Sequence, residues 1–128
     1  MNDPLEDPQA EQSKQVNNIP TLSQDQVFGL KFILSPNEAK IFTSLPVTIG
    51  RSEQNDIVIN DKTISAVHAR VYFDHRVNDV CIVDNESLNG ILIDGYPTYR
   101  NLLQDGIRIK LGEVTITFRD TGYIHSEP

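Results

Sequence analysis

Alternation of apolar and polar residues is the main pattern along most of the chain. The stretch VFGLKFILS has an apolar residue at every second position from Phe28 to Leu34, which is the period of two that a β-strand gives. In GIRIKLG the three aliphatic side chains share one face, and Arg108 and Lys110 take the other. In VTITF the two threonines oppose the apolar positions in the same way. Each stretch predicts a strand with one buried face.

Further short stretches have the same strand-like character. They are rich in β-branched residues and bounded by Asn, Asp, Gly or Pro: PVTIG, DIVIN, HARVYFD, DVCIVD and GILIDG. No longer segment has the period of about 3.6 that a helix gives. Many short strands, with turn signals about every 8 to 12 residues, are typical of an antiparallel β-sandwich or barrel. The fold class is therefore predicted to be all-β, with no substantial helix.

Three dipeptides predict tight turns between these strands. They are Asn89-Gly90, Asp94-Gly95 and Asp105-Gly106. Both residues of such pairs tolerate a positive φ, as the short turns of β-hairpins require. Asn89-Gly90 lies between CIVD and ILID, so its first interpretation is a hairpin turn. A binding role for Asn89 is the alternative, because loops often carry function.

The first 26 residues differ from the rest of the chain. They are polar, contain three prolines and offer no aromatic residue for a core, a composition that favours disorder. The sequence therefore predicts an acidic, disordered N-terminal tail over 1–26, a β-domain over 27–119 and a C-terminal tail over 120–128. The chain has 18 acidic and 11 basic residues and a net charge of −7, and both the N-terminal tail and the domain are acidic.

This charge balance excludes two classes of partner. Nucleic-acid binders carry a basic patch, and anionic membranes attract basic segments, so neither a nucleic acid nor a membrane is an expected partner. No apolar run is long enough to cross a bilayer, and the N-terminus lacks the apolar core of a secretory signal. Cys81 is the only cysteine, and its strand-like surroundings predict a small buried hydrophobe. A cytoplasmic location is expected.

Ser65 and His68 raise the question of catalysis, because a serine and a histidine can form a nucleophile and its base. Ser65 lacks the strained glycine elbow of hydrolases, and no set of base, orienting group and oxyanion donors is complete. The glycines form neither the G-x-x-x-x-G-K-[ST] motif nor the G-x-G-x-x-G motif of nucleotide-binding proteins. The three histidines have no cysteine or acidic partner at zinc-like spacing. The chain is therefore predicted not to be an enzyme and to hold no metal or cofactor.

Three loop elements instead predict a small binding site. Arg51 follows a strand, the Ser-x-x-His segment 65–68 precedes a second strand, and the Ser-x-Asn-Gly segment 87–90 precedes a third. The loops of a sandwich cluster at its two ends, so these elements can meet. An arginine fork, a hydroxyl and an amide that converge there would bind an oxyanion.

The order of these elements resembles the forkhead-associated (FHA) domain family across roughly residues 28–119. The elements are GR at 50–51, NDIVI at 55–59, SAVHA at 65–69, DNESLNG at 84–90 and DGIRIKLG at 105–112. A lone Ser-x-x-His is common by chance, whereas all of these elements in this order and spacing are specific. The resemblance implies an FHA-like antiparallel β-sandwich of about eleven short strands. It also implies that the loops at one end of the sandwich bind phosphothreonine peptides.

The same resemblance implies a role for each matched loop residue. Arg51 and Ser65 would contact the phosphate, and Asn89 would hold the peptide backbone beside the phosphothreonine. His68 would brace a loop through hydrogen bonds rather than act on a ligand. The predicted phosphopeptide-binding residues are Arg51, Ser52, Ser65, Ala66, Leu88 and Asn89, with structural support from Gly50, His68 and Gly90.

The sequence departs from the family pattern next to the site serine. Ala66 and Val67 stand where many family members have Arg, Lys or Asn. The loss of one charge-assisted contact weakens binding by roughly 1.5–3 kcal/mol, unless Ser52 or Lys62 compensates. Two further departures are Ile91, where threonine is common, and Asp94, where asparagine is frequent.

These observations leave two functions open. The first is a phosphothreonine-dependent adaptor in Ser/Thr kinase signalling, whose partner is a phosphothreonine-containing protein or peptide, such as a kinase or its substrate. The second is a phospho-independent protein–protein interaction or assembly module that uses the faces of the sandwich. A monomer is expected. A dimer through a phosphorylated tail, with Thr21 as the candidate residue, is the alternative.

Overall fold

A computed structural model of the protein describes residues 25–121, and all regular structure in that range is β. The strands in chain order are β1 Asp25–Ser35, β2 Glu38–Leu45, β3 Val47–Gly50, β4 Ile57–Val58, β5 Ala69–Asp74, β6 Asp79–Asp84, β7 Ile91–Ile93, β8 Tyr96–Thr98, β9 Arg100–Leu102, β10 Arg108–Leu111 and β11 Val114–Asp120. The all-β prediction is therefore confirmed for these residues. The predicted tails, 1–26 and 120–128, lie largely outside them.

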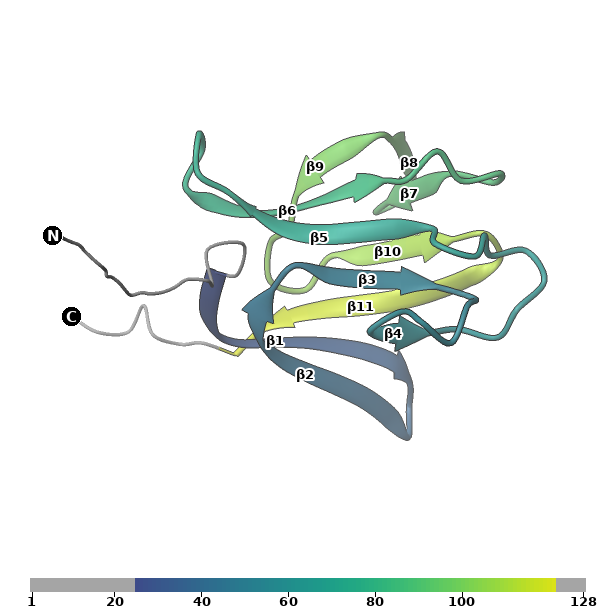
Figure 1. Ribbon diagram of the computed structural model, residues 1–128, viewed down its shortest axis with the longest axis horizontal. Coiled ribbons are helices and arrows are strands. Elements are labelled where there is room, and N and C mark those ends of the chain that lie inside the picture. The colour runs from purple at the N-terminus through teal and green to yellow at the C-terminus, as the bar shows by residue number, and fades with distance from the viewer. Residues whose placement is uncertain (1–24, 122–128) are drawn as a thin grey trace, which may run out of the picture.

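The strands form two sheets that pack face to face (Figure 1). The six-stranded sheet has the order β2-β1-β11-β10-β7-β8, and the five-stranded sheet has the order β4-β3-β5-β6-β9. Pairings between the described strands are antiparallel, except that the short β4 pairs in parallel with β3. Because each sheet keeps two open edges, the fold is a sandwich and not a closed barrel.

The core between the sheets follows the predicted alternation. Leu30 and Phe32 of β1 are buried. The ring of Phe32 packs against Phe42 and Phe118, with centroids 6.0 and 5.4 Å apart. On β10 the aliphatic side chains are buried, whereas Arg108 on the opposite face is exposed. A slip of one residue would turn each of these faces toward water, so the buried face fixes the register of the strands.

The predicted turns differ in outcome. Asp94-Gly95 forms the two-residue turn of the β7–β8 hairpin, with φ values of 47° and 92°. Asp105-Gly106 also forms a turn, with a φ of 90° at its glycine. The hairpin interpretation of Asn89-Gly90 is wrong, because β6 and β7 belong to different sheets. The dipeptide lies in a loop that crosses between the sheets, and only its glycine has a positive φ, of 76°.

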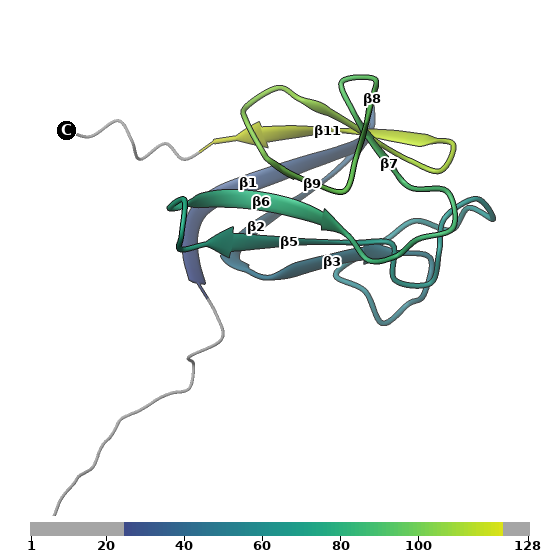
Figure 2. The same ribbon diagram turned by 90° about the horizontal axis from the view of Figure 1, so that it is seen from above.

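Strand direction gathers the predicted site loops at one end of the sandwich. The β3 and β6 strands run toward that end and β5 starts from it, so the β3–β4, β4–β5 and β6–β7 loops lie together there (Figure 1, Figure 2). The start of β1 and the end of β11 lie at the opposite end (Figure 1). The fold therefore separates the candidate site from both ends of the described chain.

Candidate functional site

The β3–β4 loop lies directly against the β4–β5 loop. The Arg51 N–H donates to the Ser65 carbonyl at 3.0 Å, and the Ser52 N–H donates to the Ala66 carbonyl at 3.1 Å. These backbone bonds leave the Arg51 side chain exposed. The guanidinium is thus presented at the surface from a fixed backbone.

Gly50 is required by this close approach. A Cβ at Gly50 would lie 2.2 Å from the Ala66 carbonyl oxygen, a distance that no packed side chain tolerates. The buried side chain of Asn55 fills the remaining space, and its Nδ2 donates to the carbonyls of Ser52 and Ala66 at 2.8 and 2.7 Å. Asn55 was not among the predicted site residues, although it is the first residue of the quoted motif NDIVI.

His68 is fully buried and connects two loops. Its Nδ1 accepts a hydrogen bond from the Ser65 N–H at 3.1 Å, and its Nε2 donates to the Gly90 carbonyl at 2.8 Å. With Nδ1 as acceptor and Nε2 as donor, the ring is the neutral tautomer. Both nitrogens are occupied by the backbone, so His68 does not contact the Ser65 hydroxyl. The pair is therefore not arranged as a nucleophile and its base.

The β6–β7 loop is held down by the same neighbours. The Leu88 N–H donates to Ser65 Oγ at 3.0 Å, and Asn89 Nδ2 donates to the Thr63 carbonyl at 2.8 Å. Ser65 thus has a structural bond in addition to its predicted ligand contact. Its hydroxyl oxygen accepts from the loop, which leaves the hydroxyl proton able to donate outward.

Thr63 links this site to the β10–β11 turn. Its hydroxyl oxygen accepts from the Glu113 N–H at 2.8 Å, while a Cβ at Gly112 would lie 2.4 Å from the Thr63 carbonyl oxygen. The Asp61 carboxylate accepts from both the hydroxyl and the N–H of Thr63. These hydrogen bonds, the side-chain bond first, lower the pKa of Asp61 below its usual value. The carboxylate therefore stays charged, and keeps its bonds, below the pH at which a free aspartate is protonated.

The three loops enclose a small surface depression of about 250 Å³, called the loop depression below. It is lined by Arg51, Lys62, Thr63, Ile64, Ser65, Ala66 and Leu88. Two cationic side chains and no carboxylate line it. Four of the predicted binding residues therefore meet there. Ser52 does not line it, and its hydroxyl accepts from the Gln54 N–H at 3.2 Å; Asn89 lines a neighbouring depression.

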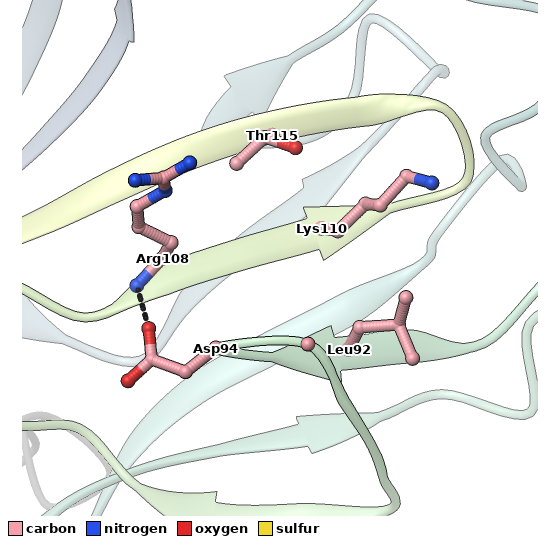
Figure 3. A pocket seen from close by; sticks show the side chains of 6 residues that line it. Leu92, Asp94, Arg108, Lys110 and Thr115 are labelled. Carbon is pink, nitrogen blue, oxygen red and sulfur yellow. Dashed lines mark hydrogen bonds between the residues drawn. The ribbon is translucent and has the colours of Figure 1, made fainter.

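A larger depression of about 430 Å³ lies on the outer face of the six-stranded sheet (Figure 3). It is lined by Leu92, Asp94, Gly95, Arg108, Lys110 and Thr115. None of the residues predicted to bind or support a ligand lines it. The Asp94 carboxylate, which accepts from the Arg108 N–H at 2.9 Å, adds a negative charge beside the two cations (Figure 3). For a dianionic ligand, the loop depression is the better match.

Among residues 25–121, no group of three or more His, Cys, Asp or Glu side chains could hold a metal ion. Cys81 is free and buried, as its surroundings predicted. No helix in the described part of the chain is long and apolar enough to cross a membrane.

Comparison with known sequences identifies a shared domain. The family model of the FHA domain matches residues 47–112. The mouse (Mus musculus) protein "Angiogenic factor with G patch and FHA domains 1" is 32% identical over an alignment of 82 residues, and the match covers 57% of this chain and 12% of that protein. This chain therefore spans only a small part of that relative's length.

Comparison with solved structures finds the same sandwich. The solution structure of the FHA domain of an Arabidopsis thaliana hypothetical protein matches with a TM-score of 0.66 and 29% identity, covering 76% of this chain and 89% of that one. A structure from a study of phosphothreonine-dependent FHA domain interactions matches with a TM-score of 0.61 and 23% identity, covering 71% and 95%.

Replacing His68 with Ala is expected to lower the free energy of unfolding by about 1–3 kcal/mol, because two buried polar groups lose their partner. Urea denaturation of both proteins measures this. The control is His75→Ala, since the His75 side chain is 72% exposed where it meets Asp25, and a surface change is expected to stay within about 0.5 kcal/mol. Equal midpoints for the two variants would show that His68 does not brace the loops.

Proposed function

Because this chain belongs to the FHA domain family, we propose that it binds phosphothreonine-containing segments of partner proteins in Ser/Thr kinase signalling and catalyses no reaction. The observation that carries the proposal is the loop depression, where Arg51, Lys62 and Ser65 converge without any carboxylate. The FHA structure from the study of phosphothreonine-dependent interactions, which shares this fold, supports it.

Arg51 is the group that we assign to the phosphate. A phosphothreonine carries about −1.5 to −2 charges and three strong acceptor oxygens, and the planar guanidinium can bind two of them at once. The Arg51 backbone is already fixed by its bond to the Ser65 carbonyl. Only side-chain freedom is therefore lost on binding, which favours affinity.

Ser65 and Asn89 complete the contact with the peptide. Ser65 Oγ accepts from the Leu88 N–H, so its own proton is directed toward a phosphate oxygen. Asn89 donates one N–H to Thr63 and keeps its side-chain carbonyl and second N–H for the backbone of an extended peptide. The roles of donor and acceptor are thus set before the ligand arrives.

Lys62 is the residue that compensates for the missing cation at Ala66. It lines the loop depression together with Arg51, whereas Ser52, the other candidate, does not line it. The ammonium group is a flexible point charge rather than a fork. We therefore assign Lys62 to electrostatic attraction of the phosphate and Arg51 to its orientation.

Arg51→Ala is expected to weaken phosphopeptide binding at least tenfold, about 1.4 kcal/mol, with the fold intact because the side chain is exposed. A ligand is first selected from a degenerate phosphothreonine peptide library on the wild-type protein and then titrated by calorimetry. Arg108→Ala is the matched control, since it removes the same charge from the sheet-face depression of Figure 3.

Three results would contradict the proposal. Equal affinity of Arg51→Ala and wild type for the phosphopeptide would exclude the loop depression as the binding site. Loss of binding in Arg108→Ala alone would move the site to the sheet face. Equal binding of the phosphorylated and phosphatase-treated peptide would favour the phospho-independent interaction module instead.

Lys62→Ala is expected to weaken binding by roughly three- to tenfold, or about 0.7–1.4 kcal/mol, and the loss should shrink at high salt because exposed charges are screened. Adding Ala66→Lys to that variant should restore affinity, since it returns a cation to the rim. Lys110→Ala serves as the charge-matched control. If Lys62→Ala binds as tightly as Lys110→Ala, Arg51 acts alone.

Phosphorylated Thr21, which lies outside the described residues, is expected to engage a second molecule and form a dimer. The four residues from Thr21 to the start of β1 span at most about 14 Å. The site lies at the other end of the sandwich (Figure 1), and a six-residue strand such as β5 alone spans about 20 Å. Light scattering over a dilution series should show a dimer that Arg51→Ala abolishes. A compact monomer with Arg51 already occupied would contradict this.

A further inference from the structure

The outer face of the five-stranded sheet gathers arginines and apolar side chains. Val71 of β5 and Ile82 of β6 are buried in the core, so the residues that alternate with them point outward. The strand register places these outward residues in two rows across β5, β6 and β9: Arg70, Val83 and Arg100 in one row, and Tyr72, Cys81 and Leu102 in the next. Because neighbouring strands lie about 4.8 Å apart, the backbones of Arg70 and Arg100 are roughly 10 Å apart.

Tyr72 holds both of these arginines. The Arg70 guanidinium lies over the Tyr72 ring, 5.1 Å from its centroid, and Arg100 Nη1 donates to the Tyr72 hydroxyl at 3.3 Å. Both arginines are exposed. Among residues 25–121, neither of them forms an ion pair with a carboxylate. Most of their N–H groups therefore stay available to an anion.

A surface depression of about 440 Å³, called the β6–β9 depression below, lies beside this pair. Its lining includes Asp74, Arg76, Val77, Cys81, Arg100 and Leu102. The Asp74 carboxylate already accepts two hydrogen bonds from the Arg76 guanidinium, at 3.2 and 3.1 Å. These bonds, with the Arg76 N–H, lower the pKa of Asp74 below its usual value. Asp74 thus offsets Arg76, and the charge of Arg100 is left for a ligand.

Apolar side chains border the same depression. Val77 is 54% exposed and Leu102 is 38% exposed, whereas Cys81 points outward but is nearly covered. The edge strand of this sheet is β9, and its three residues are exposed, so a ligand can approach from that side. An available guanidinium beside exposed aliphatic carbon suits a carboxylate that has an apolar neighbour.

The β6–β9 depression is separate from the loops that we assign to the phosphate. The β5 strand starts at the end of the sandwich where those loops lie, and the β5–β6 turn, which holds Arg76 and Val77, lies at the opposite end (Figure 1, Figure 2). The loop depression and the β6–β9 depression share no lining residue. One molecule can therefore engage a ligand at each of them.

The charge of the chain decides between classes of partner for this face. A polyanion such as a nucleic acid is repelled at long range by the net charge of −7. Arg70 already covers one face of the Tyr72 ring, so the ring offers little stacking surface to a base. A peptide carboxylate needs only nearby cations, because charges beyond about 8–10 Å are largely screened. An acidic peptide is therefore the better match.

We propose that the β6–β9 depression, with Arg70 and Tyr72 beside it, is a second binding site that takes an unphosphorylated acidic segment of a partner protein. A carboxylate of the segment binds the guanidinium groups of Arg70 and Arg100. A neighbouring aliphatic or aromatic side chain of the segment packs against Val77 and Leu102. The proposal does not depend on phosphopeptide binding at the loop depression. With both sites in use, the domain joins a phosphorylated protein to an acidic one.

The test is a library of unphosphorylated peptides in which Asp, Glu, Gln, Lys, Leu, Phe and Ser vary at every position. Selection on the full chain is expected to enrich sequences with Asp or Glu next to Leu or Phe. The selected peptide is then titrated. Replacing its acidic residues with Gln, or its apolar residue with Ser, should weaken binding at least about fivefold in each case.

Two arginine variants form the matched pair. Arg100→Ala and Arg108→Ala each remove one exposed arginine, but Arg108 lies on the outer face of the other sheet. Arg100→Ala should weaken binding of the selected peptide at least about fivefold, whereas Arg108→Ala should leave it within about twofold. Denaturation midpoints show that both variants are folded.

Several outcomes would overturn the second site. No enrichment of acidic peptides would do so, as would equal affinity of the two arginine variants for the selected peptide. Loss of binding in Arg51→Ala alone would place the acidic peptide in the loop depression instead. A single-stranded oligonucleotide or a second copy of the chain that binds through Arg100, with no peptide enriched, would assign the face to that partner. None of these results alters the phosphopeptide titrations, so the two proposals fail separately.

Discussion

The hydrogen bonds of one buried ring, that of His68, hold together the loops at one end of the sandwich. Nδ1 accepts from the β4–β5 loop and Nε2 donates to the β6–β7 loop, so neither loop can shift without leaving a polar group unpaired in the interior. Loops are otherwise the mobile part of a domain. The two His68 hydrogen bonds hold the β4–β5 and β6–β7 loops in one fixed arrangement. A fixed arrangement lowers the entropy that a ligand contact with these loops would cost.

A second pair of hydrogen bonds in the same loops decides which polar atoms remain exposed. The Ser65 hydroxyl oxygen is occupied by Leu88, and one Asn89 N–H is occupied by Thr63. What remains at the surface is the Ser65 proton, the rest of the Asn89 amide and the Arg51 guanidinium. These groups can donate to an anion, but His68, the base that catalysis at Ser65 would need, has both ring nitrogens bound to the backbone. The hydrogen bonds of these loops thus leave donor groups at the surface and keep Ser65 and His68 from pairing as a nucleophile and its base.

The strands could be predicted from local pattern, because a period of two reports directly which side chains face a core. The role of Asn89-Gly90 could not, since the dipeptide has the local form of a hairpin turn and only the assignment of β6 and β7 to different sheets makes it a crossing loop. The supporting roles of Asn55 and Thr63 could not be predicted for a similar reason. The Asn55 side chain donates to the Ala66 carbonyl and the Thr63 hydroxyl oxygen accepts from the Glu113 N–H, and such contacts between distant residues leave no local signal beyond the motif NDIVI.

The charge of the molecule explains why one phosphate contact would not be enough. The chain carries a net charge of −7, so long-range attraction to a phosphorylated, anionic partner is weak, and only nearby cations act on it. With Ala66 in place of a third cation, the cations that line the loop depression are Arg51 and Lys62. Apolar contact is not opposed by net charge. In an acidic domain with two cations at the loop depression, uncharged contacts are therefore the ones that long-range repulsion weakens least.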